Sequence, residues 1–112
     1  MTRTRRGRRR DEDEEPPRVL RLRPDYLAFP LWWPNSMAAP EELPLSPELV
    51  DALHRWADVY DQLPGRDFQW PSENALDEFV AEGFRLWRRL QLELGPEWTV
   101  EYTDERTGRR ST

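Results

Sequence analysis

His54, the only histidine of the sequence, is the side chain best suited to acid–base chemistry, and Asp58 follows it by four residues. Residues four apart share one face of a helix, so the Asp58 carboxylate could orient the imidazole of a general base. Such a base activates a nucleophile, but no cysteine occurs and no serine stands near the pair. His54 lies about 140° around a helix from Leu49, which places it on the solvent side. We therefore interpret His54 and Asp58 as a surface pair.

Acidic side chains are numerous, but they follow no catalytic or metal-binding spacing. Six of them fall on the outer sides of two expected helices: Glu48, Asp51, Asp58, Asp61, Glu78 and Glu82. No two are placed by spacing in an apolar pocket, which would raise the pKa of one carboxyl group or create a metal site. HExxH, EF-hand, glycine-rich phosphate-loop and nucleophile-elbow motifs are absent from the sequence. We expect no catalytic residue, metal or cofactor, and an enzyme ranks third among the functional hypotheses.

The N-terminus holds the motif most typical of nucleic-acid binding. Six arginines could displace counterions from phosphates: Arg3, Arg5, Arg6, Arg8, Arg9 and Arg10. Five consecutive acidic residues follow at 11–15, and residues 18–102 carry fifteen acidic residues against eight arginines. Such an acidic region repels phosphate backbones, and no helix-turn-helix or zinc-finger pattern accompanies the arginines. Nucleic-acid binding, through this tail only, is therefore the alternative function.

An aromatic cluster bracketed by prolines is the best candidate for a binding site. Its members are Tyr26, Phe29, Trp32 and Trp33. Alternate residues of an extended segment point to opposite sides, so Trp32 and Trp33 cannot both be buried against one layer unless the backbone turns. An exposed aromatic side chain on an edge strand is a common anchor for a protein partner. Two alternatives stay open: both tryptophans could cover the ends of a small core, or one could stack on a sugar ring, although polar residues that would fix the ring are lacking.

Strands are expected on both sides of a helical region. Residues 19–23 alternate between apolar and charged side chains, and residues 98–102 alternate between large apolar and polar ones. Residues 26–33 are rich in strand-forming types, but Pro30 and Pro34 remove backbone donors. We expect a first strand, a short edge strand or extended loop, and a closing strand that pairs with the first.

Two helices are expected between these strands. Ser46 and Pro47 begin the first, which ends near Pro64, and Ser72 caps the second, which ends at Gly95. Each has one apolar stripe: Leu49, Leu53, Trp56, Tyr60 and Leu63 on the first, and Leu76, Phe79, Val80, Gly83, Trp87, Leu90 and Leu94 on the second. The pattern predicts an α+β domain of two layers, in which two antiparallel helices pack on a two- or three-stranded sheet in the order β-(β)-α-α-β. Gly83 indicates close packing of the second helix against the sheet or the first helix, because glycine inside a helix costs about 1 kcal/mol relative to alanine.

The chain divides into one domain and two tails. We expect a disordered tail at 1–17, a single α/β domain at 18–102 and a frayed C-terminal tail at 103–112. The charged N-terminus lacks the apolar stretch of a secretory signal, and no apolar run approaches a membrane span. The absence of cysteine favours a cytoplasmic location.

Several short segments between residues 22 and 102 together form a recognisable sequence pattern. The segments are Leu22–Tyr26, Pro30–Trp32, Leu45–Leu49, Trp56, Tyr60–Asp61, Glu82–Gly83, Leu92–Gly95 and Val100–Tyr102. In this pattern the chain resembles a group of short actinobacterial proteins that carry no assigned activity. The resemblance implies a bacterial, cytosolic, single-domain protein and transfers no function or site residue.

Our leading hypothesis is a non-catalytic protein-interaction module of the inhibitor, immunity or antitoxin kind. Acidic helical faces and the segment 26–34 would contact the partner, which we expect to be a basic protein because acidic surfaces steer association with basic ones.

Overall fold

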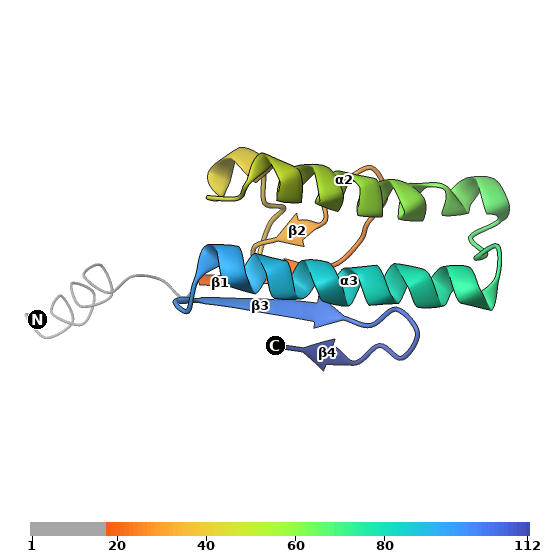
Figure 1. Ribbon diagram of the computed structural model, residues 1–112. Coiled ribbons are helices and arrows are strands. Elements are labelled where there is room, and N and C mark those ends of the chain that lie inside the picture. The colour runs from red at the N-terminus through yellow and green to blue at the C-terminus, as the bar shows by residue number, and fades with distance from the viewer. Residues whose placement is uncertain (1–17) are drawn as a thin grey trace, which may run out of the picture.

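The computed structural model describes residues 18–112, which form two helices and a four-stranded sheet (Figure 1). The tail expected at residues 1–17, with its six arginines, lies outside the described residues. In chain order the main elements are β1 (Arg18–Leu22), β2 (Leu31–Trp32), α2 (Pro47–Asp61), α3 (Glu73–Leu94), β3 (Trp98–Thr103) and β4 (Arg110–Ser111). Short 3₁₀ turns at Pro40–Glu42 and Leu63–Arg66 stand before and after α2.

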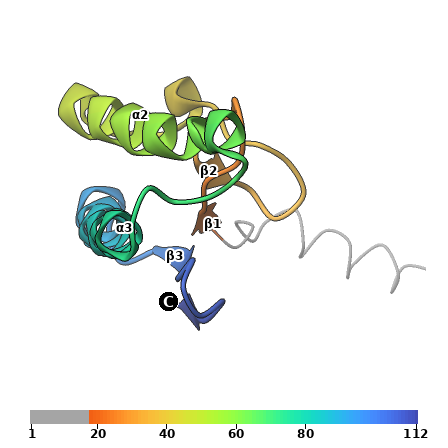
Figure 2. The same cartoon turned by 90° about the vertical axis from the view of Figure 1, so that its right-hand side faces the viewer.

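Two layers make up the fold, as the sequence predicts. The helices lie side by side on one face of the sheet, whose strand order is β2-β1-β3-β4 (Figure 2). Each element from β1 to β3 reverses the direction of the one before it, so α2 and α3 are antiparallel and β3 returns parallel to β1 (Figure 1). The expected pairing of the first and closing strands is therefore confirmed, and the sheet is mixed.

The core lies between the helical layer and the inner face of the sheet. Leu20 pairs with Val100 and Leu22 with Tyr102, and all four side chains are fully buried. Most positions of both predicted helix stripes join this core, with Leu53 on α2 among the fully buried ones. The alternation of β1 and β3 is thus the signature of a sheet with one covered face.

Side-chain caps hold the helices at the predicted ends. The Ser46 hydroxyl accepts a hydrogen bond from the Leu49 N–H, and the Ser72 hydroxyl accepts one from the Ala75 N–H. Glu93 near the end of α3 reaches back to α2, where its carboxylate accepts from the Ser46 N–H and hydroxyl, both at 2.8 Å. The start of one helix is therefore tied to the end of the other.

Side chains of α3 also close the free edge of β3. The Val100 N–H and C=O point away from β1, and the Gln91 and Trp87 side chains occupy that side. Gln91 accepts from the Val100 N–H and donates to the Trp98 C=O, while the Trp87 indole N–H donates to the Val100 C=O. A helix thus supplies the hydrogen bonds that a neighbouring strand would otherwise make.

The edges of the sheet are the short strands β2 and β4, and only β4 differs from the sequence-based expectation. Residues 26–33 contribute only the two-residue edge strand β2. Residues 103–112, expected to fray, turn at Asp104, whose C=O accepts from the Gly108 N–H, and return as β4. Tyr102 pairs with Ser111, so the sheet extends past residue 102. The ladder bonds of this hairpin are the physical reason that it stays attached.

Candidate partner-binding surface

The charge of the helical layer is unevenly distributed along the molecule. Residues 56–84 contain seven acidic side chains and one arginine, whereas residues 85–93 contain three arginines and one glutamate. Because α2 and α3 are antiparallel, the first stretch, which runs from the end of α2 through the turn into the first half of α3, lies at one end of the domain (Figure 1). We call this the acidic end; its acidic residues are Asp58, Asp61, Asp67, Glu73, Asp77, Glu78 and Glu82.

Several of these carboxylates face solvent without an ion-pair partner among the described residues. Asp58, Asp67, Glu73 and Glu78 are exposed, and no ion pair or hydrogen bond to their side chains occurs within residues 18–112. Others are engaged: Asp77 pairs with Arg106 at 3.1 Å, and Glu82 pairs with its neighbour Arg85 on α3. The unpaired carboxylates leave a negative field at this end of the domain.

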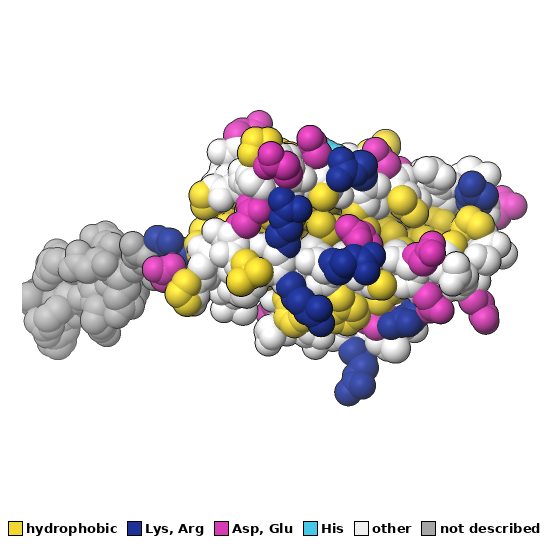
Figure 3. All heavy atoms as spheres, viewed as in Figure 1, with side chains coloured by type: hydrophobic (Ala, Val, Ile, Leu, Met, Phe, Trp, Pro, Cys, Tyr) yellow, Lys and Arg dark blue, Asp and Glu magenta, His cyan; other side chains and the backbone are white. Residues whose placement is uncertain are grey.

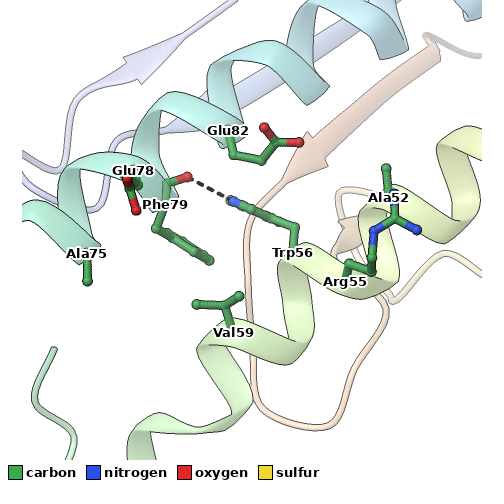
Figure 4. Close-up of a pocket in the computed structure, with 8 residues that line it drawn as sticks. All are labelled: Ala52, Arg55, Trp56, Val59, Ala75, Glu78, Phe79 and Glu82. Atoms are coloured by element: carbon green, nitrogen blue, oxygen red, sulfur yellow. Dashed lines mark hydrogen bonds between the residues drawn. The ribbon is translucent and has the colours of Figure 1, made fainter. Parts of the chain in front are cut away.

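An apolar groove runs between α2 and α3 next to the acidic end. It has a volume of about 360 Å³ and is lined by Ala52, Arg55, Trp56, Val59, Ala75, Glu78, Phe79 and Glu82 (Figure 4). Trp56 and Phe79 form its floor with rings stacked at 4.5 Å, and the Trp56 indole N–H donates to the Phe79 C=O. Apolar side chains occupy the band between the helices, with charged ones of both signs along its borders (Figure 3). Val59 is exposed at the groove wall.

Aromatic side chains also gather at the acidic end. Tyr26 stacks on Tyr60 at 4.7 Å and meets Phe68 edge-on at 5.8 Å. Burial raises the pKa of the Tyr60 hydroxyl, and the contact with Tyr26 and the negative charges of Glu105 and Asp25 act in the same direction. The aromatic cluster therefore also lies close to two carboxylates outside the acidic end, Glu105 and Asp25.

Three residues in or beside this cluster have a left-handed backbone conformation. Leu27, Asp67 and Phe68 have φ angles of 58°, 57° and 60°, although none is a glycine. This conformation costs on the order of 1 kcal/mol for each such residue. Leu27 is 91% exposed and Phe68 is 65% exposed, so neither offsets the strain by burial. Backbone strain beside exposed apolar side chains is typical of binding sites.

The four aromatic residues singled out in the sequence do not form one patch. Tyr26 lies at the acidic end, whereas Phe29 packs beneath α2 with its ring 5.0 Å from His54. Trp32 lies on the outer face of the sheet, where the Arg23 guanidinium stacks 4.2 Å from its ring. Trp33 packs against the core, 6.0 Å from Trp98.

The two tryptophans thus face different ways: Trp33, which follows β2, packs against the core and Trp32 does not. The expectation that Trp32 and Trp33 cannot be buried against the same layer is confirmed, and only Trp33 covers an end of the core. An open recess of about 400 Å³ borders both, with Arg21 and Arg23 on its rim. Arg21 is already paired with Glu101 at 3.1 Å and Arg23 with Asp25 at 3.8 Å, so these cations are partly neutralised.

Sequence reasoning missed Leu27 and Phe68. Each is a single apolar residue in a polar turn, and solitary apolar residues are common on protein surfaces. The one available signal for Phe68 was its place three residues after Gly65 of the Pro64-Gly65 turn. Their left-handed backbone has no sequence signature at all, because it is favoured by glycine and asparagine rather than by leucine or phenylalanine.

Potential reactive groups are dispersed over the described residues. His54 is exposed on α2, and no hydrogen bond joins it to Asp58 within residues 18–112. No group of three His, Asp or Glu side chains in this range comes together as metal ligands would. No helix within the described range is long and apolar enough to cross a membrane.

Comparison with known protein families identifies the family to which this chain belongs. The model of a family described as Serratia CdiI immunity protein-like matches residues 18–105. The chain belongs to this family. The match spans β1 through β3, so both helices and the acidic end belong to the immunity protein-like region, whereas β4 follows it. No curated protein matches the chain.

Membership in an immunity protein-like family supports a non-catalytic, inhibitor-type role in protein interaction, and so confirms the leading sequence-based hypothesis at that level. The resemblance to actinobacterial proteins stays a prediction. So do the basic character of the partner and the cytoplasmic location.

Proposed function

We propose that this chain is an immunity protein that neutralises a basic protein toxin by binding to it through the acidic end. The family assignment supports a toxin as the partner. The observation that carries the choice of surface is the concentration of acidic side chains around exposed apolar ones at the turn between α2 and α3. Such a surface attracts a basic partner at long range and offers apolar area for close contact.

Inhibition by binding needs no chemistry from the immunity protein itself. A complex blocks a toxin when it covers or distorts the toxin's own site, and its lifetime then decides the protection. The apolar groove over Trp56 and Phe79 adds area beside the acidic end, and Glu78 on its rim would meet cationic side chains. Tyr26 belongs to the same surface, whereas we assign Phe29 and Trp33 to packing.

A growth assay followed by binding tests the proposal. Each protein encoded by the genes that flank the gene for this chain is produced alone and together with the chain. We expect one of them to arrest growth, and co-production of the chain to restore growth through a stoichiometric complex. Rescue without a complex, or no growth-arresting protein among the flanking products, would contradict the proposal.

Charge reversal then tests the surface. The double variant Asp58→Lys, Glu78→Lys changes two exposed carboxylates at the acidic end. Its matched control is Glu41→Lys, Glu97→Lys, which makes the same change in net charge at the opposite end, before α2 and after α3. We expect the first pair to slow association on the order of tenfold at low salt and to weaken its salt dependence. Equal effects of both pairs would contradict the assignment to the acidic end.

The alternative function, nucleic-acid binding through the N-terminal arginines, gives a different result. Removal of residues 1–17 would then abolish binding, and nuclease treatment would release the partner. Under the proposed function, neither treatment changes the complex.

A further inference from the structure

Leu27 and Phe68 stand out at the acidic end because the fold holds them in solvent. Their side chains are 91% and 65% exposed, the largest exposures of a leucine and a phenylalanine among the described residues. Both have left-handed φ angles, and Asp67 beside Phe68 has one as well. Glycine or asparagine would suit these positions better for folding alone.

Hydrogen bonds fix the backbone in this unfavourable form. The Leu27 N–H donates to the Asp61 carboxylate at the end of α2, at 3.0 Å. The Phe68 N–H donates to the Leu63 C=O at 2.7 Å, which closes the turn that follows α2. Both apolar side chains are therefore presented from anchored backbone, so little conformational entropy would be lost when they become buried in a partner.

Tyr26 joins the two residues into one feature. It precedes Leu27 in the chain, its ring meets the Phe68 ring edge-on at 5.8 Å, and its other contact is the Tyr60 ring on α2. An aromatic base packed on the helical layer thus contacts the Phe68 ring and adjoins Leu27 in the chain. Binding hot spots have this construction, in which a few apolar anchors project from a preorganised surface.

Carboxylates surround the two side chains. Asp61 binds the Leu27 backbone, Asp67 precedes Phe68, and Asp25 lies two residues before Leu27. Arg66 and Arg23 are the nearby cations, and Arg23 is paired with Asp25. This setting disfavours an anionic lipid surface and a second copy of the same acidic end, since each would bring like charges together.

We propose that Leu27 and Phe68 form a two-residue anchor that inserts into an apolar pocket rimmed by basic side chains on the partner protein. The inference rests on the proposed function and names the contact that gives the complex its lifetime. Charge at the acidic end steers the encounter, while burial of the anchor slows dissociation.

Substitution by asparagine separates binding from folding. Asparagine tolerates left-handed backbone, so the variant Leu27→Asn, Phe68→Asn retains or raises the thermal midpoint of the chain. The same variant loses the apolar contact, and we expect its dissociation from the growth-arresting protein to accelerate at least tenfold. A residue that served only the fold could not produce opposite changes in stability and affinity.

Leu92→Asn provides the matched control. Leu92 is 83% exposed on α3, in the half of the helix remote from the acidic end. We expect this variant to bind as the parent does. An asparagine variant of Leu27 and Phe68 that binds like the parent, or a loss of equal size with Leu92→Asn, would overturn the anchor.

The two proposals fail differently. If the parent chain binds no growth-arresting protein, both are wrong. If Asp58→Lys, Glu78→Lys slows association but the asparagine variant dissociates like the parent, the proposed function stands and the anchor is wrong.

Discussion

The helix α3 passes Tyr102 of β3 with no room for a side chain at Gly83. A Cβ atom built on Gly83 would overlap the Tyr102 hydroxyl and lie 2.9 Å from its ring carbon Cε1. Tyr102 is fully buried, and its hydroxyl donates to the Val80 C=O one turn earlier on α3. The predicted close packing of Gly83 is therefore against the sheet.

Gly83→Ala should destabilise the protein although alanine is the better helix former. We expect overpacking to cost about 2–3 kcal/mol, which exceeds the gain of about 1 kcal/mol in helix propensity. Urea unfolding measures the difference. Gly65→Ala is the control, because a Cβ there has no neighbour within 4 Å. A stabilised Gly83→Ala variant would contradict the close approach.

The contact between Gly83 and Tyr102 should also appear as an energetic coupling. Tyr102→Leu removes the ring that the added methyl group would meet, so the cost of Gly83→Ala should shrink by about 1 kcal/mol or more in that background. Unfolding free energies of the parent, both single variants and the double variant give the coupling. Additive effects would show that the cost of alanine arises elsewhere.

The bond between Glu93 and Ser46 should make the stability depend on pH. Burial alone would raise the pKa of Glu93, but hydrogen bonds from the Ser46 N–H and hydroxyl, together with Arg89, hold it below its ordinary value of 4.5. A lowered folded pKa stabilises the folded state above about pH 4.5, and this contribution is lost as pH falls through the folded pKa.

Glu93→Gln should remove part of that dependence. We expect the variant to be less stable than the parent by about 1 kcal/mol at pH 7, a modest figure because the side chain is partly exposed. Below about pH 5, its stability should decrease less with falling pH than that of the parent. Thermal unfolding across this range measures both. Glu97→Gln, exposed beyond α3, should retain the parent's profile. A variant with the parent's stability at pH 7 would show that the cap contributes little.

Gln91→Ala should open the edge of β3. The variant leaves the Val100 N–H and Trp98 C=O without the partners they have in the fold, so we expect a loss of about 1–3 kcal/mol. A strand edge with free backbone groups also pairs with other chains, so larger species should appear in sedimentation velocity. Arg88→Ala, exposed one turn earlier, is the control. Identical stability and sedimentation of the two variants would contradict the edge-closing role.

The ends of the two helices and their apolar stripes could be predicted from the sequence because each depends on residues that are close together in the chain. Ser46 with Pro47, and Ser72 with Gly95, are start and stop signals that act within one helical turn. The alternation of Leu20 and Leu22 indicated which side of β1 is covered. The β4 strand was not predictable, since Arg110 and Ser111 have no apolar pattern and depend on the turn at Asp104.

The candidate site was predictable only in part. The acidic character of the helical faces follows from composition, and Tyr26 was identified by its aromatic neighbours in the sequence. Its actual neighbours, Tyr60 near the end of α2 and Phe68 in the turn that follows, are distant in the chain. The proposed anchor depends on this long-range proximity and on backbone angles that sequence patterns do not report.

Parallel pairing of β1 with β3 has a kinetic consequence. Arg21 and Glu101 are bonded neighbours on the outer face of the sheet, yet they are separated by 80 positions in the chain. Closing such a span is slow compared with forming the turn between α2 and α3, whose contacts are local. During synthesis the helical hairpin can therefore form early, but the sheet and core must wait until β3 has left the ribosome. A nascent chain truncated before residue 98 would expose the apolar faces of both helices, so β3 decides when the protein becomes able to bind.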